Sequence, residues 1–296
     1  MGLRTRKGKG SCCLLFLLSA ALGCSDVSPP TENESSDLQP EAGAAFDPRS
    51  AGVIRGQVVW SGDVPVVPPL EVQPNPLAGE ILHKRQLRPN PNAPSIEPGS
   101  KGLANAVVFL RGIDPKRGRP WDHPPVRVEQ RAGEFHVIQG GADSHCGFVR
   151  RGAALTMISR DPFFHSLHAR GAAYFTLTFP DPDRPLRRSL KENGLVELTS
   201  AAGYYWMRAY VFVADHPYYT RTDIHGRFTL AQVPPGRYEI VCWLPSWTKA
   251  RHERDPESGC VARLFFNPPL SRAQPINLGP GEVKEVKLVS SLHSPG

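Results

Sequence analysis

Three short stretches of this sequence contain the candidate ligands for a soft transition metal. They are "DSHCG", with His145 and Cys146, "RDPFFHSLH", with His165 and His168, and "YYWM", which ends at Met207. A trigonal site for such a metal uses two imidazoles and a thiolate in one plane, with a thioether as a weak further contact. The elements that position these residues therefore decide whether the chain can hold a metal.

Those elements are predicted to be β-strands. Apolar and polar residues alternate through 54–60, 135–138 and 237–244, and no comparable stretch keeps helical spacing over several turns. The 31 prolines and 27 glycines gather between such runs, which favours many short strands joined by turns. We therefore expect an all-β fold made of Greek-key sandwiches, with a long surface loop over 66–100.

The C-terminal part contains two turns that are specific enough to suggest a family. In "TDIHGRF", Asp223 and Gly226 stand at a bend between strands, and "VPPGRYEI" sets a second bend with Pro234 and Gly236. Residues 219–289 resemble the carboxypeptidase-regulatory-like, or transthyretin-like, β-sandwich module. The resemblance implies a small domain that usually has no catalytic role.

The segment before this module resembles a second family. "MISRDPFFHSLHARG" (157–171) and "LTSAAGYYWMRAYVFVADHPYY" (198–219) are similar to the cupredoxin-like domain of the plastocyanin and methylamine-utilisation-protein group. This resemblance implies a Greek-key sandwich with a type I copper site. The first motif would carry one histidine ligand, and the second would carry cysteine, histidine and methionine in one loop before the last strand.

Two of the four implied copper ligands are replaced in this chain. His165 matches the first histidine and Met207 the axial methionine. Ser200 stands where the thiolate is expected, or Ala201 if the loop is one residue shorter, and Tyr204 replaces the second histidine. A serine hydroxyl stays protonated near neutral pH, and a tyrosine phenol must lose a proton before it binds a metal well. We therefore expect no cofactor and a vestigial, aromatic-filled site, with copper binding as the alternative.

A replacement ligand set can be drawn from His165, His168 and Cys146. If 145–148 begins the strand that leads to Met157, Cys146 stands at the far end of a strand from His165. We therefore favour histidines that are partly buried and hydrogen-bonded to turn backbone over a metal site.

Catalytic patterns are also weak. Asp143, Ser144 and His145 resemble a catalytic triad, but sequence neighbours on a strand point to opposite faces. The charged run "RHERDPE" is typical of a solvated loop of ion pairs. The sequence has no phosphate-binding glycine loop, no HExxH and no GxSxG motif. We expect a protein that is not an enzyme.

The N-terminus predicts export. A basic stretch from Arg4 to Lys9 precedes an apolar run over 13–22, and "ALGC" ends at Cys24 in a pattern that resembles a bacterial lipobox. Cys24 is the predicted lipidated first residue of the mature protein, and an ordinary cleaved signal is the alternative. Residues 25–51 are rich in Ser, Pro and Glu, which predicts a disordered tether. The protein would then be anchored at the cell envelope, facing the periplasm or the cell surface.

Three cysteines remain beyond the signal, namely Cys146, Cys242 and Cys260. A disulfide between Cys242 and Cys260 would stabilise the fold by roughly 3 kcal/mol, and three buried thiols are the alternative.

The formal net charge of +7 falls to +3 once the four basic residues of the signal are removed. Because no aromatic residues interleave with the densest basic patch, Arg184, Arg187, Arg188 and Lys191, we expect no nucleic-acid partner.

These observations predict the following organisation: signal 1–24, disordered linker 25–51, cupredoxin-like domain 52–218, carboxypeptidase-regulatory-like domain 219–289 and tail 290–296. The stretches "IRGQVVW" and "LANAVVFLRG" fit the opening strands of either domain. The expected role is non-catalytic binding or scaffolding of an envelope protein or a polysaccharide, with membrane attachment through the lipid.

The candidate contact surface consists of the aromatic residues Tyr204, Tyr205, Trp206, Tyr218 and Tyr219. The alternative is that these rings pack between the two domains. Two other functions stay open. One is a copper-binding periplasmic electron carrier. The other is a carbohydrate-binding protein, which would expose coplanar aromatics among Trp121, Trp206, Trp243 and Trp247.

Overall fold

The computed structural model describes residues 2, 45–72, 86–257 and 259–291. These residues form strands and no helices, which confirms the all-β prediction, and none of them forms a segment that could cross a membrane as a helix. The described residues from 45 to 291 belong to one compact unit. The predicted signal, Cys24 and most of the predicted linker lie outside the described residues.

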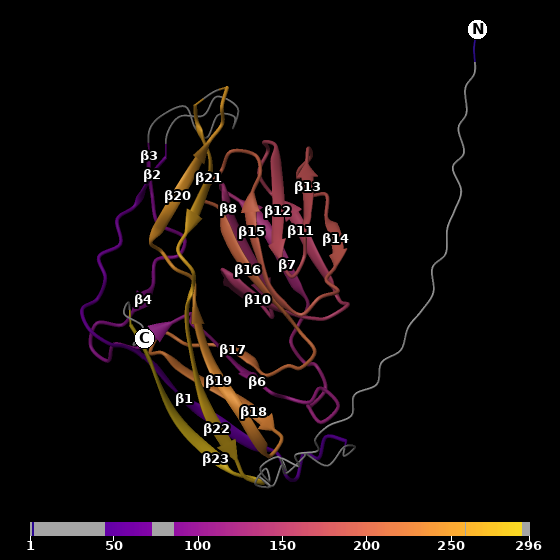
Figure 1. Cartoon of the computed structure of the whole chain (residues 1–296), viewed down its shortest axis with the longest axis vertical. Helices are drawn as coiled ribbons and strands as arrows, with labels where there is room; N and C mark the ends of the chain where they lie inside the picture. Colours follow the sequence, from indigo (N-terminus) through magenta and orange to yellow (C-terminus); the bar gives the residue numbers. More distant parts are fainter. Residues whose placement is uncertain (1, 3–44, 73–85, 258, 292–296) are drawn as a thin grey trace, which may run out of the picture. The chain divides into compact units, whose positions relative to one another are not determined.

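Two five-stranded sheets form what we call the central sandwich (Figure 1). The first has the order β10 (Cys146–Arg150), β16 (Arg208–Ala214), β15 (Gly194–Ser200), β12 (His165–Gly171) and β13 (Phe175–Phe179). The second has the order β14 (Leu186–Ser189), β11 (Ala154–Ser159), β7 (Val126–Arg131), β8 (Glu134–Gln139) and β9 (Ala142–Ser144). Alternate residues of both sheets, such as Val128 and Leu167, point into one core because side chains of a strand alternate between its faces.

Two smaller sheets form the split sandwich, named for its strands that lie on both sides of the central sandwich in sequence. One has the order β18 (Arg227–Val233), β1 (Gly52–Trp60) and β23 (Val283–Ser290). The other has the order β17 (Tyr219–Arg221), β6 (Val107–Arg111), β19 (Gly236–Leu244) and β22 (Leu270–Leu278). Ile54, Leu110 and Ile240 are fully buried between them.

The strand pairing differs from the predicted division of the chain after residue 218. Gly52–Trp60 pairs with β18 and β23, and Val107–Arg111 pairs with β17 and β19, so these two strands belong with the C-terminal strands rather than with the central sandwich. The central sandwich is thus inserted between β6 and β17. An alternating apolar pattern fits any sheet with one buried face, so the pattern alone could not assign the two strands.

The predicted surface loop over 66–100 also needs correction. It contains β2 (Leu70–Val72), β3 (Gln86–Arg88) and β4 (Ser95–Ile96), and β4 pairs with β5 (Leu103–Ala104). Strands of two or three residues are too short to show a period in sequence. The remaining pair of strands is the hairpin of β20 (Lys249–Arg254) and β21 (Val261–Phe266).

The predicted bend at "TDIHGRF" is confirmed between β17 and β18. Asp223 Oδ1 accepts hydrogen bonds from the backbone N–H groups of His225 and Arg227, both at 2.8 Å. Gly226 has a φ of +76°, and a Cβ on it would lie 2.2 Å from the carbonyl oxygen of Val58. Only glycine fits there, because both the backbone conformation and the neighbouring strand exclude a side chain.

The two sandwiches meet through a third apolar group, which we call the interface cluster. It consists of Val107, Phe109, Val241 and Trp243 from the split sandwich, and Cys146, Phe148, Tyr210 and Phe212 from the central one. The ring of Phe212 lies 5.1 Å from Trp243 and 5.9 Å from Phe109, centroid to centroid. The sheet that contains β16 and the sheet that contains β19 therefore each bury a second face, the one that points away from their own sandwich core. This explains why every residue of β16 is buried.

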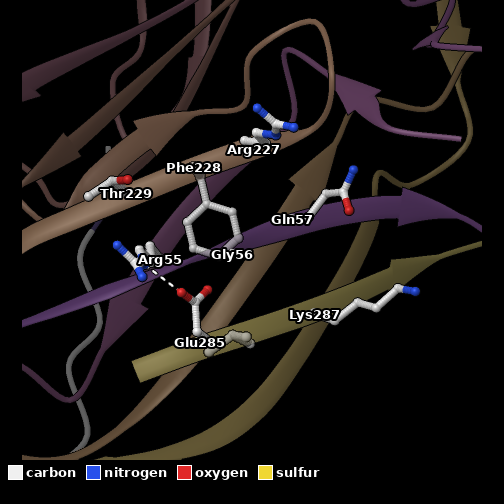
Figure 2. A pocket seen from close by; sticks show the side chains of 9 residues that line it. Arg55, Gly56, Gln57, Arg227, Phe228, Thr229, Glu285 and Lys287 are labelled. Atoms are coloured by element: carbon white, nitrogen blue, oxygen red, sulfur yellow. Dashed lines mark hydrogen bonds and ion pairs between the residues drawn. The ribbon is translucent and has the colours of Figure 1, made fainter. Parts of the chain in front are cut away.

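The opposite side of the split sandwich is a solvated polar face (Figure 2). Arg55 on β1 and Glu285 on β23 form an ion pair of 2.5 Å, and Lys287 extends from the same face. Both members of the pair are more than half exposed, so it contributes at most about 1 kcal/mol. Charged outward side chains of this kind are typical of a sheet with one solvated face.

Candidate functional site

The four positions aligned with copper ligands lie at one end of the central sandwich. His165 begins β12, Ser200 ends β15, and Tyr204 and Met207 lie in the connection from β15 to β16. The Cα of Leu167, next but one to His165, is paired with that of Ser200, and all four residues are buried. The structure therefore brings together the positions that the sequence motifs indicated.

His165 is completely buried and is held by an acid. Its Nε2 lies 2.8 Å from Oδ2 of Asp161, whose carboxylate also accepts the backbone N–H groups of Ala132 and Gly133 at 2.6 and 3.0 Å. Burial lowers the pKa of His165, although the Asp161 carboxylate acts in the opposite direction. In the neutral imidazole, Nε2–H donates to Asp161 and Nδ1 keeps its lone pair. Nδ1 has no hydrogen-bond partner within the described residues.

Tyr204 fills the space beside this imidazole. The ring centroids of Tyr204 and His165 are 4.9 Å apart, and Trp206 packs edge-on against Tyr204 at 5.6 Å. Trp206 is fixed in turn, because its Nε1 donates to the carbonyl oxygen of Gly133 at 2.8 Å. Burial raises the pKa of Tyr204 to about 12, so its phenol is protonated at neutral pH and is a poor metal ligand.

The arrangement does not fit a type I copper ion. Ser200 is buried on the face of β15 that carries Leu198, whereas Ala201 is exposed, so of the two candidates for the thiolate position only Ser200 faces the core. Its Oγ accepts the backbone N–H of Ala202 at 3.1 Å. What remains is one imidazole, a thioether, a protonated phenol and a hydroxyl, without the soft thiolate that such a site depends on. Over the described ranges, no group of three or more His, Cys, Asp or Glu residues is placed to hold a metal.

The replacement set of His165, His168 and Cys146 is not assembled. Successive strand pairings place Cys146 on β10 directly across the sheet from Arg170 on β12, not from His165. Three strand spacings, or roughly 14 Å, separate Cys146 from Arg170. His168 faces away from the core that contains His165, and its Nδ1 lies 2.8 Å from Thr176 Oγ1. The histidine partners are therefore side chains, Asp161 and Thr176, rather than the turn backbone that we expected.

The predicted aromatic contact surface is wrong in its exposure. Tyr204, Tyr205 and Trp206 lie in the core of the central sandwich, and Tyr218 lies in the core of the split sandwich with 0% of its surface exposed. Only Tyr219 follows the alternative of packing between the domains, since it is half-buried and stacks on Phe109 at 4.9 Å. A run of aromatics is compatible with either a core or a ligand face, and the sequence did not distinguish them.

The tryptophans do not provide a carbohydrate platform. Trp206, Trp243 and Trp247 are buried, and Trp121 is half-buried. Sugars bind to exposed aromatic faces, so this observation speaks against the carbohydrate-binding alternative at these positions.

The triad-like residues 143–145 are not connected as a triad. Asp143 Oδ2 lies 2.9 Å from Nδ1 of His136 and 3.2 Å from Arg131, while Ser144 Oγ donates to the carbonyl oxygen of Cys146 at 2.7 Å.

Sequence reasoning missed a cleft beside these residues. His145 and Arg221 line a cleft of about 280 Å³ together with residues of the loop 91–95. No local motif marks it, because its walls come from distant segments.

Cys146 and Cys242 are free thiols in the described part of the chain, so the predicted bridge between Cys242 and Cys260 is not formed. Burial raises the pKa of Cys146 and of Cys242 to about 12. The thiolate is the reactive form, so both should be alkylated about 1000-fold more slowly in the native protein than an exposed cysteine. Iodoacetamide labelling followed by peptide mass spectrometry measures each site, with the unfolded protein as control. Rapid native labelling of Cys146 would contradict its burial.

We expect the stability of the fold to depend on pH through His216. Its ring stacks on Tyr219 at 5.4 Å beside a pocket of about 630 Å³ between the sandwiches, and burial lowers its pKa to about 4. Between pH 6.5 and 4 the unfolded state binds more protons at this residue, so stability falls as the pH falls through this window. The loss approaches about 3 kcal/mol.

Urea unfolding at pH 7 and pH 4.5 tests this dependence. Because burial also lowers the pKa of His123, His145, His165 and His168, the wild-type protein should lose stability beyond the contribution of His216 alone. His216→Phe keeps an aromatic ring and should remove roughly 2 to 3 kcal/mol of the difference. The exposed His225→Gln serves as control and should leave the difference unchanged. An unchanged difference in His216→Phe would contradict the assignment.

No protein-family model matches the chain, and no curated protein matches it. Solved structures resemble part of it. A mutant of amicyanin with Cu(I) has a TM-score of 0.25 and 17% identity, covering 30% of this chain and 81% of that chain. The Cu-containing nitrite reductase (NirK) from Thermus scotoductus SA-01 has a TM-score of 0.25 and 14% identity, covering 35% of this chain and 24% of that chain. These weak structural neighbours are cupredoxins, and at this level of similarity nothing follows from them about copper in this chain.

Proposed function

We propose that this chain is an exported, non-catalytic protein of the cell envelope, anchored through Cys24, that binds or scaffolds an envelope protein or polysaccharide. In this proposal the central sandwich is a cupredoxin-like domain whose copper ligands have been replaced. The split sandwich is the carboxypeptidase-regulatory-like module that its turn motifs suggest. The proposal is supported mainly by the Tyr204 ring, which packs 4.9 Å from the His165 imidazole where a second ligand would stand.

The residues Ser200 and Tyr204 also explain why we propose a binding role rather than electron transfer by copper. Ser200 has no thiol, and burial keeps the Tyr204 phenol protonated. A site with one available imidazole nitrogen and a thioether would hold copper weakly. The copper-binding electron carrier therefore remains the alternative that the first experiment must address.

Titration of the purified protein with copper provides that test. We expect no intense visible charge-transfer band and no tight stoichiometric binding by calorimetry. His165→Ala and the exposed His225→Ala should behave like the wild-type protein. A tight site that His165→Ala abolishes and His225→Ala retains would overturn the proposal and restore the electron carrier.

A further inference from the structure

Arg221 is a half-buried cation without an acidic partner in the described part of the chain. It ends β17, and its Nη1 donates to the carbonyl oxygen of Cys146 at 2.8 Å and to Ser144 Oγ. Of the acids in the described ranges, none lies within 4.0 Å of its guanidinium, and Nε and Nη2 have no hydrogen-bond acceptor there. Burial lowers the pKa of Arg221, which indicates that the charge is held at a cost in solvation.

This guanidinium lines the cleft of about 280 Å³ that also contains His145, and we call this space the Arg221 cleft. One wall is apolar and consists of Pro91, Pro94, Leu244 and Pro245. The loop that forms part of this wall is fixed, because the buried Asn92 donates to the Ser246 carbonyl oxygen at 2.9 Å and accepts from Tyr210 at 3.1 Å. The cleft is therefore preformed rather than dependent on a loose loop.

The acids that line the cleft already have cationic partners. Asp143 contacts Arg131 at 3.2 Å and His136 at 2.9 Å, and Glu134 lies 3.9 Å from Arg88. Arg221 is thus the unmatched charge of the cleft. One negative charge would neutralise it, whereas a doubly charged anion would leave one negative charge unmatched in the cleft.

A second pocket of about 320 Å³ continues from the cleft. The two share six lining residues, namely Pro91, Ala93, Ser95, Asn105, Glu134 and His145. The exposed side chain of Asn105 has no hydrogen-bond partner in the described part of the chain, so its amide is available to a ligand. The combined space suits an elongated molecule with one charged end and polar groups along its length.

We propose that the Arg221 cleft binds a small organic carboxylate, with the carboxylate on the Arg221 guanidinium and the body of the molecule along the proline-lined wall. A guanidinium offers two parallel N–H donors that match the two oxygens of a carboxylate. Two natural sources present this chemistry, the C-terminal end of a peptide and a uronic acid sugar. The inference rests on the proposed binding role and gives it a ligand class.

Titrations with matched acid and neutral probes test the inference. The peptide arm compares N-acetyl-Gly-Leu with its amide, and the sugar arm compares galacturonate with its methyl ester. We expect at least one acid to bind with a Kd in the millimolar range or below, and its neutral partner to bind at least 10-fold more weakly. The acid that binds more tightly identifies the source. Calorimetry gives the affinity, and amide shifts of Asn105 and His145 give the location.

Variants separate this site from non-specific charge effects. Arg221→Gln should lose at least 10-fold in affinity for the acid, while Arg111→Gln, on the exposed Arg111 paired with Glu239, should bind as the wild-type protein does. If Arg221→Gln does not fold, the wild-type acid and neutral comparison and the shift map decide the question. Equal binding of acid and neutral probes, unchanged binding by folded Arg221→Gln, tighter binding of inorganic phosphate, or no acid binding at 20 mM would each overturn the inference. If the Arg221 cleft does not bind a carboxylate, the result of the copper titration that tests the proposed function is unaffected.

Discussion

A variant that carries Ser200→Cys and Tyr204→His should bind copper tightly and turn blue. His165 Nδ1 is already buried without a hydrogen-bond partner in the described residues, and Met207 is buried at the end of the same loop. Replacing Tyr204 places an imidazole where its ring now lies 4.9 Å from His165, and the Ser200→Cys change supplies the missing thiolate. Thiolate and two imidazoles form the plane that type I copper requires.

The expected change is large. Copper binding should strengthen at least about 1000-fold over the wild-type protein, which corresponds to about 4 kcal/mol. An intense visible band should appear, because the thiolate donates charge to Cu(II). The metal-free variant should be less stable by roughly 2 kcal/mol, since histidine is smaller than the buried tyrosine it replaces, and copper should restore that stability.

Two controls distinguish the geometry from the mere presence of ligands. Tyr204→His alone lacks the thiolate and should stay colourless. Ala201→Cys with Tyr204→His places the thiol on an exposed residue, so it should not give the blue band. A blue Ala201→Cys variant beside a colourless Ser200→Cys variant would contradict our assignment of Ser200 to the thiolate position.

Sequence reasoning could name the candidate ligand positions because each depends on local order. His165 lies at the start of one strand and Met207 just before another, and strand alternation decides which neighbours share the core. The identity of the residue at each position then determines the chemistry. The burial of Tyr205 and Tyr218 could not be obtained in this way, because an aromatic residue is equally suited to a core or to a binding face.

The domain boundaries and the Arg221 cleft depend on contacts between distant segments. β1 pairs in parallel with β23, so Arg55 is beside Glu285 although 230 residues separate them. A period-2 pattern states that a strand has a buried face but does not name its partner. Likewise, Arg221 is an ordinary basic residue in sequence, and its unmatched charge appears only when β17 is placed against β10 and the loop 91–95.

Phe212→Ala should be strongly destabilising and should uncouple the two sandwiches. Phe212 is 6% exposed and its ring lies within 6.2 Å of Phe109, Phe148 and Trp243, centroid to centroid. Removing such a ring from a packed core costs about 3 to 5 kcal/mol, because both apolar burial and neighbouring contacts are lost. Urea unfolding at pH 7 measures the loss, and Ile224→Ala, at an exposed turn residue, should change the free energy of unfolding by no more than about 0.5 kcal/mol.

The shape of the unfolding curve carries more information than its midpoint. The central sandwich is joined to the split sandwich through the chain before β7 and after β16 and through the faces that form the interface cluster. If that cluster provides the coupling, the wild-type protein unfolds in one transition and Phe212→Ala in two, seen as separate changes in near-UV circular dichroism and in tryptophan fluorescence. Trp206 reports on the central core, and Trp247 reports on the split core. A single transition in Phe212→Ala, with a loss in the free energy of unfolding below about 1 kcal/mol, would mean that other contacts couple the two sandwiches. The hairpin β20–β21 offers such contacts, because Arg208 donates to the Leu264 carbonyl oxygen.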